Sequence, residues 1–312
     1  MKPFHPPRRI LMGPGPSEVS PRVLAALARP TIGHLDPAFI GLMDEIQQLL
    51  QYAFRTTNAL TLPVSAPGSA GMEAAFVNLL EPGDKVIVCQ NSVFGSRMQQ
   101  NVERCGGEAV LVSDEWGHCI DPEKVAAALR ANPDARALAF VHAETSTGVR
   151  SDAAALCALA RENGCLSIVD TVTSLGGVDV DVDGWGIDAV YSGTQKCLSC
   201  VPGMSPVSFS PLAVERIRSR TRPVQSWFLD MNLIMDYWGS SEQALSSRRS
   251  YHHTAPVNNL YALHESLLML QEEGLEAAWD RHRRNHEALR DGLEGIGLSL
   301  QVPPAERVPQ LN

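Results

Sequence analysis

Lysine is scarce in this chain, whose 312 residues include only four: Lys2, Lys85, Lys124 and Lys196. The first three have ordinary solvated settings, namely the terminal tail, the turn EPGDK and the first turn of an expected helix. Lys196 instead follows the apolar run DAVYSG and precedes a turn lined by Cys and Leu. An ammonium group among apolar neighbours is costly unless something uses it. The sequence therefore singles out Lys196 as a functional side chain.

Long apolar runs and basic surfaces are also lacking. No segment has the length of a signal peptide or a transmembrane helix, and the final residues VPQLN are no targeting signal. The formal net charge of −9 and the absence of a Lys/Arg stripe argue against nucleic-acid binding. The basic stretch RHRRNHEALR is read as a solvated helix face rather than an anion site. We expect a cytoplasmic protein with neither membrane nor nucleic-acid partners.

The seven cysteines are odd in number and scattered through apolar segments, which indicates free thiols in a reducing compartment. Cys197 and Cys200 have CxxC spacing, but no second pair lies nearby, so packing is favoured over zinc or redox chemistry. His252 and His253 are a metal pair by type but have no acidic or Cys partner at ligand spacing. We therefore expect no metal site.

Short apolar runs alternate with amphipathic helical stretches along most of the chain. The expected strands are 60–66, 85–89, 108–112, 137–142, 166–170, 188–193 and 206–210, with expected helices at 70–80, 95–106, 122–132 and 152–164 between them. Continuous apolar strands separated by helices predict an α/β fold with a mainly parallel sheet covered on both faces. No Walker loop or GxGxxG motif is present, so nucleotide binding is not indicated.

From about residue 260 the pattern becomes helical, and a strand-like piece, LSLQVPP at 298–304, precedes the last residues. We expect three parts: an N-terminal arm at 1–19, a large domain at 20–260 and, at 261–312, the start of a smaller α+β domain that is not completed.

The residues that follow the strands carry the chemistry, because ligands in parallel sheets bind beyond the carboxyl ends of the strands. Gly68 and Ser69 form a turn that opens into a helix, an anion seat suited to phosphate, although such turns are commonplace. Asp170 ends an apolar strand, where an N-cap or a buried hydrogen-bonding acid is the ordinary alternative. Lys196 follows the next strand. A polar turn, HAETSTGV, follows the strand at 137–142.

One small molecule needs a phosphate seat, an isolated carboxylate and a half-buried amine at the same sheet edge: pyridoxal 5′-phosphate. Its aldehyde forms a Schiff base with an amine, its phosphate suits a helix N-terminus, and its pyridine nitrogen needs a carboxylate that keeps it protonated. Burial lowers the pKa of such a lysine, so that the amine can act as nucleophile and base near neutral pH. The coincidence predicts this cofactor, with Lys196 and Asp170 as catalytic residues.

The stretch DAVYSGTQKCLSCVPGMS resembles the lysine signature of the class V pyridoxal-phosphate aminotransferases. The stretches LMGPGPSEVSPRVL, SAPGSAGMEAAFVNLLEPGD, HAETSTGV, VDTVTSLGG and YHHTAPVNNLYALHESL are similar, in order, to its alanine–glyoxylate and serine–glyoxylate branch. The resemblance implies fold type I, with a mixed but mainly parallel seven-stranded sheet sandwiched by helices and a smaller α+β C-terminal domain.

The resemblance also implies roles for individual residues. Lys196 matches the Schiff-base lysine, Asp170 the acid bonded to the pyridine nitrogen, and Val172 a residue packed on one ring face. Phe94 matches the aromatic residue stacked on the other face, with plain core packing as its alternative. The remaining cofactor contacts implied are Gly68, Ser69, Thr145 and Gln195, although the family often has His in place of Ser69. Tyr251 and Thr254 match residues that reach the phosphate of a neighbouring subunit, which implies a homodimer.

The activity implied is ping-pong transamination between alanine or serine and a 2-oxo acid such as glyoxylate or pyruvate. A relative that uses (S)-ureidoglycine or pyridoxamine, or an inactive homologue that binds the cofactor, is the alternative. A cysteine desulfurase needs a late catalytic Cys, and no Cys follows Cys200.

One element of the family pattern is missing. The arginine that holds the substrate carboxylate belongs to the small domain, past residue 312, and neither Arg248 nor Arg249 fits its motif. The Gly13–Gly15 loop and Asn258 or Asn259 are further candidates for substrate contact.

Overall fold

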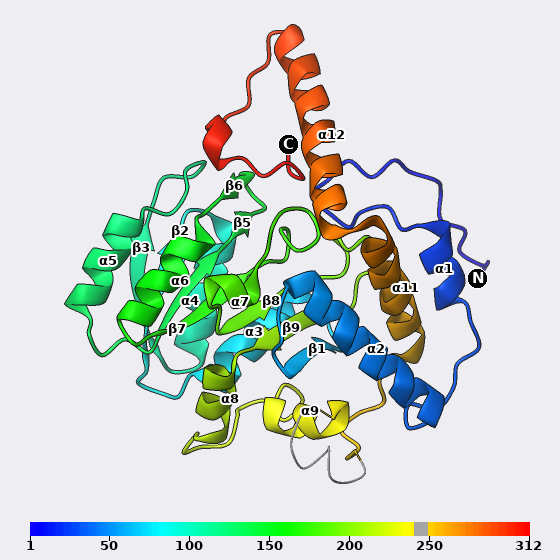
Figure 1. Cartoon of the computed structure of the whole chain (residues 1–312), viewed down its shortest axis with the longest axis horizontal. Helices are drawn as coiled ribbons and strands as arrows, with labels where there is room; N and C mark the ends of the chain where they lie inside the picture. The colour runs from blue at the N-terminus through cyan, green and yellow to red at the C-terminus, as the bar shows by residue number, and fades with distance from the viewer. Residues whose placement is uncertain (240–248) are drawn as a thin grey trace.

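The computed structural model describes residues 1–239 and 249–312. Its centre is a seven-stranded sheet in the order β1-β9-β8-β7-β4-β2-β3 (Figure 1). In sequence order the strands are β1 (Leu60–Val64), β2 (Lys85–Gln90), β3 (Glu108–Ser113), β4 (Ala137–Val141), β7 (Leu166–Asp170), β8 (Ala189–Tyr191) and β9 (Ser205–Phe209). All neighbours are parallel except β9, which is antiparallel to β1 and β8. The predicted mixed, mainly parallel sheet is confirmed.

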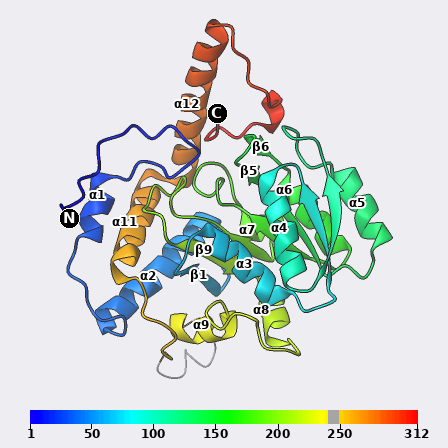
Figure 2. The same ribbon diagram turned by 180° about the vertical axis from the view of Figure 1, so that it is seen from behind.

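Helices cover both faces of this sheet. The helices of the described residues are α1 (Pro21–Leu27), α2 (Pro37–Phe54), α3 (Gly68–Leu79), α4 (Val93–Arg104), α5 (Pro122–Ala131), α6 (Ala153–Glu162), α7 (Val182–Trp185), α8 (Pro211–Arg218), α9 (Met231–Trp238), α11 (Val257–Glu273) and α12 (Leu275–Gly295). In Figure 1 α6 and α7 lie in front of the sheet, and Figure 2 shows α3 and α4 on the opposite face. All four helices expected between the strands are present.

Local sequence explains the strands and the helix starts. Every residue of β1 and β4 is buried, as expected for apolar strands with helices on both sides. Asp121 accepts a hydrogen bond from the Glu123 N–H and begins α5, with Pro122 at the first helical position. Asp152 caps α6 in the same way, through the Ala155 N–H. These caps place the helix starts within two residues of their predicted positions.

The sequence reading overlooked α2, whose start at Asp36–Pro37 carries the same capping signal. Helix α11 packs against both α1 and α2 beside β1, and the boundary expected between 260 and 261 falls inside it. Helix α12 then projects from the body, and the last residues return toward a small hairpin of β5 (Ala143–Glu144) and β6 (Val149–Arg150) (Figure 1).

The strand expected at 298–304 is wrong. The segment is irregular and leads into a single 3₁₀ turn at Pro304–Glu306. Pro303 and Pro304 have no N–H to donate to a sheet. Among the described residues, the chain pairs with a strand only after this piece, where Arg307 forms an antiparallel bridge with Val149 of β6. An apolar alternation without a partner strand does not make a sheet.

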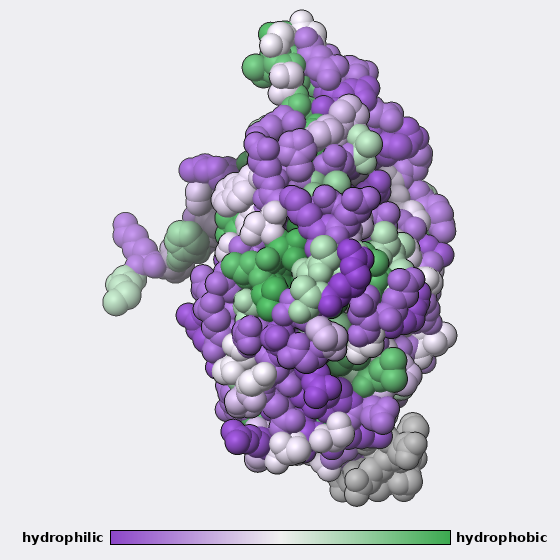
Figure 3. Space-filling view, turned by 90° about the vertical axis from the view of Figure 1, so that its left-hand side faces the viewer, coloured by the Kyte–Doolittle hydropathy of each residue, from purple (hydrophilic) through white to green (hydrophobic). Residues whose placement is uncertain are grey.

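Figure 3 shows the side of the molecule that faces left in Figure 1. This surface is mostly hydrophilic and has an apolar area near its middle. On the edge strand β3, Leu111 is 44% exposed. Within residues 1–239 and 249–312, no helix combines the length and hydropathy needed to cross a bilayer.

Candidate active site

The carboxyl ends of β1, β4, β7 and β8 lie at one edge of the sheet, since these strands run in the same direction. Asp170 is the last residue of β7 and only 2% exposed. One carboxylate oxygen, Oδ1, accepts the Val172 N–H at 2.8 Å. Burial raises the pKa of Asp170 from its ordinary 3.8 to about 7, opposed by the Val172 N–H and the nearby Tyr191 hydroxyl. That hydroxyl is buried with no hydrogen-bond partner among the described residues. A carboxylate that accepts a single N–H keeps lone pairs for another partner.

Lys196 follows β8 and is half-buried. Burial lowers the pKa of its amine, and the charge of Asp170 partly opposes the shift. The amine donates to the Pro14 carbonyl oxygen. The N-terminal arm also holds the main chain here, because the Ser17 hydroxyl donates to the Lys196 carbonyl oxygen at 2.9 Å. The Gly13–Gly15 loop thus lies on the predicted catalytic amine.

The first turn of α3 carries Gly68 and Ser69. No side chain caps this helix start, and Ser69 is exposed. The Ala70 N–H donates to the Pro67 carbonyl oxygen at 2.7 Å, which leaves the N–H groups of Gly68 and Ser69 without an acceptor inside the helix. A Cβ at Gly68 would lie 3.2 Å from Val172 Cγ2 and 3.3 Å from the Ser192 carbonyl oxygen. The turn therefore approaches the strand ends closely, and Val172 lies between the turn and Asp170.

Two further predicted residues lie at this edge. Gln195 precedes the lysine, and its side-chain oxygen Oε1 is buried without a partner. Thr145, in the β5–β6 hairpin, donates its hydroxyl to the Thr173 hydroxyl at 2.6 Å, since Thr173 itself donates to the Ala143 carbonyl oxygen at 3.1 Å. This bond ties the hairpin to the loop after Asp170. A buried oxygen without a partner among the described residues, such as that of Gln195, leaves a position for a hydrogen bond from a bound ligand.

Phe94 opens α4 and is half-buried. Its N–H donates to Glu144 Oε2 at 3.3 Å, which joins α4 to the hairpin. The guanidinium carbon of Arg97 lies 4.8 Å from the centre of the Phe94 ring. The sequence reading missed Arg97, although its place three residues after an aromatic candidate on the same helix was the available signal.

Tyr251 and Thr254 stand apart from these residues. Tyr251 is 60% exposed, its ring lies 5.3 Å from that of His34, and Thr254 is exposed as well. His252 and His253, between them, turn inward. His253 Nε2 shares a hydrogen bond with the Ser65 hydroxyl at 2.7 Å, just before the turn of α3. No cluster of three possible metal ligands occurs among the described residues.

The remaining candidates serve the surrounding structure. Cys200 is fully buried, and burial raises the pKa of both Cys197 and Cys200 to about 12, as expected for packed thiols. Arg249 pairs with Asp44, whereas Arg248 lies outside the described residues. The Asn258 amide nitrogen donates to the carbonyl oxygens of Leu27 and Arg29. Asn258 is thus committed to the loop after α1.

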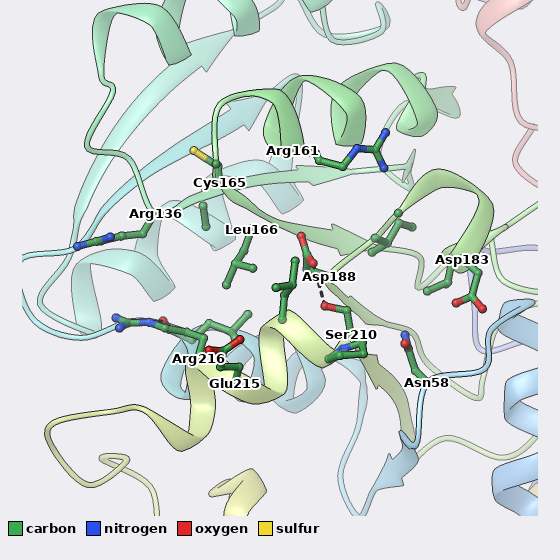
Figure 4. A pocket seen from close by; sticks show the side chains of 18 of the residues that line it. Asn58, Arg136, Arg161, Cys165, Leu166, Asp183, Asp188, Ser210, Glu215 and Arg216 are labelled. Atoms are coloured by element: carbon green, nitrogen blue, oxygen red, sulfur yellow. Dashed lines mark hydrogen bonds between the residues drawn. The ribbon is translucent and has the colours of Figure 1, made fainter.

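A pocket of about 910 Å³ opens at the opposite edge of the sheet, near the starts of β4 and β7 (Figure 4). Of the carboxylates that line it, Asp188 accepts hydrogen bonds from the Ser210 hydroxyl at 2.8 Å and the Ser167 N–H at 2.9 Å. No lysine lines this pocket. An amine-dependent reaction therefore belongs to the Lys196 edge, despite the size of this pocket.

Comparison with known proteins decides the family. The model of the aminotransferase class-V family matches residues 18–310. The chain belongs to this family. It is 42% identical to an alanine–glyoxylate aminotransferase of Oryctolagus cuniculus over 99% of this chain and 78% of the relative. The crystal structure of an alanine–glyoxylate aminotransferase from Nostoc sp. superposes with a TM-score of 0.95 at 47% identity, covering 99% and 80% of the two chains. A (S)-ureidoglycine–glyoxylate transaminase of Bacillus subtilis is 36% identical over 94% of this chain and 73% of the relative.

The chain therefore has the type I fold of the pyridoxal-phosphate enzymes, as predicted. It is a transaminase that uses pyridoxal phosphate. The residues present fit that cofactor. A half-buried amine, a buried carboxylate with spare hydrogen-bonding capacity, an uncapped helix start and the orphaned oxygen of Gln195 lie at one sheet edge.

Proposed function

We propose that this aminotransferase moves an amino group between alanine or serine and a 2-oxo acid, glyoxylate or pyruvate. The observation that carries the proposal is the juxtaposition of Lys196 and Asp170 at the ends of two adjacent strands. The Nostoc sp. and Oryctolagus cuniculus relatives, both named alanine–glyoxylate aminotransferases, support the substrate class.

Each predicted residue then has a task. Lys196 would bond the cofactor aldehyde and, once a substrate amine has displaced it, move a proton between the substrate carbon and the cofactor. The amine suits both tasks because burial lowers its pKa. The cofactor, when bound, supplies an electron sink for the carbanion. Asp170 would hold its pyridine nitrogen protonated, and that positive charge would in turn favour the ionised carboxylate.

The other contacts position the cofactor. The first turn of α3, with Gly68 and Ser69, would receive its phosphate, and Gln195 would supply a polar contact beside the lysine. Val172 and Phe94 would enclose the ring between them. Thr145 would reach the 3′-oxygen edge, from a hairpin that its bond to Thr173 holds in place.

We propose a homodimer in which Tyr251 and Thr254 reach the phosphate of the neighbouring site. Their exposure supports this, because a side chain used by another subunit is free on its own chain. We also propose an arm at 1–19, a large domain at 20–260 and a smaller domain from 261, a boundary that divides α11 between the two domains. A cytoplasmic location is supported by the seven cysteines, all of them free thiols.

A donor and acceptor screen tests the function. The purified chain is loaded with pyridoxal phosphate, and its visible absorption is followed on adding L-alanine or L-serine, then glyoxylate or pyruvate. We expect the band of the bound cofactor to disappear with the amino acid and to return with the 2-oxo acid. The same chain with Lys196→Ala is the control and should show neither change.

Two other outcomes would redirect the proposal. A response to (S)-ureidoglycine or pyridoxamine, but to neither alanine nor serine, would replace the amino donor; the Bacillus subtilis relative makes the first of these a specific candidate. Binding of the cofactor with no response to any donor would identify an inactive homologue.

A further inference from the structure

Arg97 contacts two parts of the site that were predicted separately from the sequence, the Phe94 ring and the first turn of α3. On α4 its guanidinium carbon lies 4.8 Å from the centre of the Phe94 ring, the geometry of a cation–π contact. One guanidinium nitrogen, Nη1, lies 3.4 Å from the hydroxyl oxygen of Ser69, in the first turn of α3. The side chain is half-buried. A single cation therefore spans the gap between the aromatic candidate and the phosphate turn.

Two buried carboxylates, Asp170 and Glu144, lie within reach of the charge of Arg97. Among the described residues no carboxylate forms an ion pair with it, and its hydrogen bond goes to a neutral hydroxyl. Burial raises the pKa of Glu144, and the nearby charge of Arg97 partly opposes that rise. Its two oxygens, however, accept the N–H groups of Phe94 and Ser146. The start of α3 adds the partial positive charge of a helix N-terminus. Two positive groups side by side at an open edge favour an anion between them.

We propose that Arg97 is a further ligand of the cofactor phosphate, which it binds together with the Ser69 hydroxyl and the first turn of α3. The inference rests on the proposed function, because that function supplies the phosphate. The contact with the Phe94 ring orients the guanidinium, so that the aromatic cap and the phosphate contact form one unit.

The test compares the full chain, freed of cofactor, with its variants Arg97→Ala and Arg97→Lys. Each is titrated with pyridoxal phosphate and, separately, with pyridoxal, which has the aldehyde and ring but no phosphate. We expect Arg97→Ala to weaken the binding of pyridoxal phosphate by about 10- to 100-fold, the range of one hydrogen bond to a charged group. Binding of pyridoxal should change little. Arg97→Lys keeps the charge but not the forked donors, so its loss should be smaller.

Arg104→Ala is the matched control. Arg104 lies at the end of the same helix, is exposed, and donates to the Gln100 carbonyl oxygen, away from the sheet edge. Its removal should leave both affinities unchanged. If Arg97→Ala does not fold, as judged by circular dichroism, Arg97→Lys and Ser69→Ala carry the comparison.

Two results would overturn the inference. Equal losses for pyridoxal phosphate and pyridoxal would mean that Arg97 acts only through the ring contact. An unchanged affinity for the cofactor would exclude a phosphate contact, and a weaker response to L-alanine in that case would assign Arg97 to the substrate carboxylate. Failure of the unaltered chain to bind pyridoxal phosphate would instead contradict the proposed function itself, and is visible before any variant is made.

Discussion

Replacing Asp170 by Asn should stabilise the cofactor-free protein while it inactivates the enzyme. The side chain is buried, and burial raises the pKa of its carboxyl from 3.8 to about 7. The folded chain therefore holds the proton more tightly than the unfolded chain. Below about pH 4 the carboxyl is protonated in both states, and the wild type loses no stability relative to the variant. As the pH rises through 7 the free energy of unfolding of the wild type falls, because the carboxylate must ionise in an apolar site.

The magnitude follows from the two pKa values. A shift of about three units, at about 1.36 kcal/mol per unit, makes the ionised carboxylate cost about 4 kcal/mol above pH 8. At about pH 5.5 the same arithmetic gives about 2 kcal/mol. Asn keeps an oxygen that can accept the Val172 N–H and carries no charge, so the variant should escape this cost.

Urea unfolding of both cofactor-free proteins at about pH 5.5 and pH 8 measures the difference. We expect the variant to be more stable at both values, with an advantage about 2 kcal/mol larger at the higher pH. Transamination should fall by about 100-fold or more, since the charge opposite the pyridine nitrogen is gone. A variant less stable than the wild type at pH 8, or an advantage independent of pH, would refute the reasoning.

Two further predictions concern close packing at glycines. Gly15→Ala should abolish most activity, because a Cβ there would lie 2.8 Å from the Cδ and Nζ atoms of Lys196, the proposed Schiff-base lysine, and the backbone φ is +118°. Steady-state kinetics should show no such loss for Gly13→Ala, where nothing lies within 4 Å. Gly71→Ala should lower the free energy of unfolding by about 1–3 kcal/mol through overpacking, since its Cβ would lie 2.0 Å from the Ser205 hydroxyl oxygen. Gly292→Ala, in open space on α12, is its control in thermal unfolding and should be neutral or slightly stabilising; equal effects of the two changes would contradict the packing argument.

The sheet could be predicted because its strands are continuous apolar runs between capped helices, a pattern set by local sequence and burial. Asp170 and Lys196 could be placed at one edge because parallel strands bring their carboxyl ends together. The prediction of a strand at 298–304 was wrong for the converse reason, because its apolar alternation has no partner strand among the described residues. A strand is a property of two segments, and one segment alone does not reveal it.

The contacts of Arg97 and Pro14 could not be read from the sequence. Arg97 matters because α4 aims it at Ser69 on another helix, and Pro14 matters because the arm folds back over Lys196. Both relations join residues that are distant along the chain or lie on different helices. The exposure of Tyr251 could not be predicted from the sequence either, since its predicted partner is on another subunit.

The central claim is that Lys196 holds the cofactor, and the scarcity of lysine makes a direct measurement possible. The loaded protein is reduced with borohydride, digested and analysed by mass spectrometry, so that the modified lysine carries a permanent pyridoxyl group. The account predicts this group on the peptide containing Lys196 and not on those containing Lys2, Lys85 or Lys124. A label on another lysine would contradict the claim. So would a labelled peptide from the Lys196→Ala variant treated in the same way.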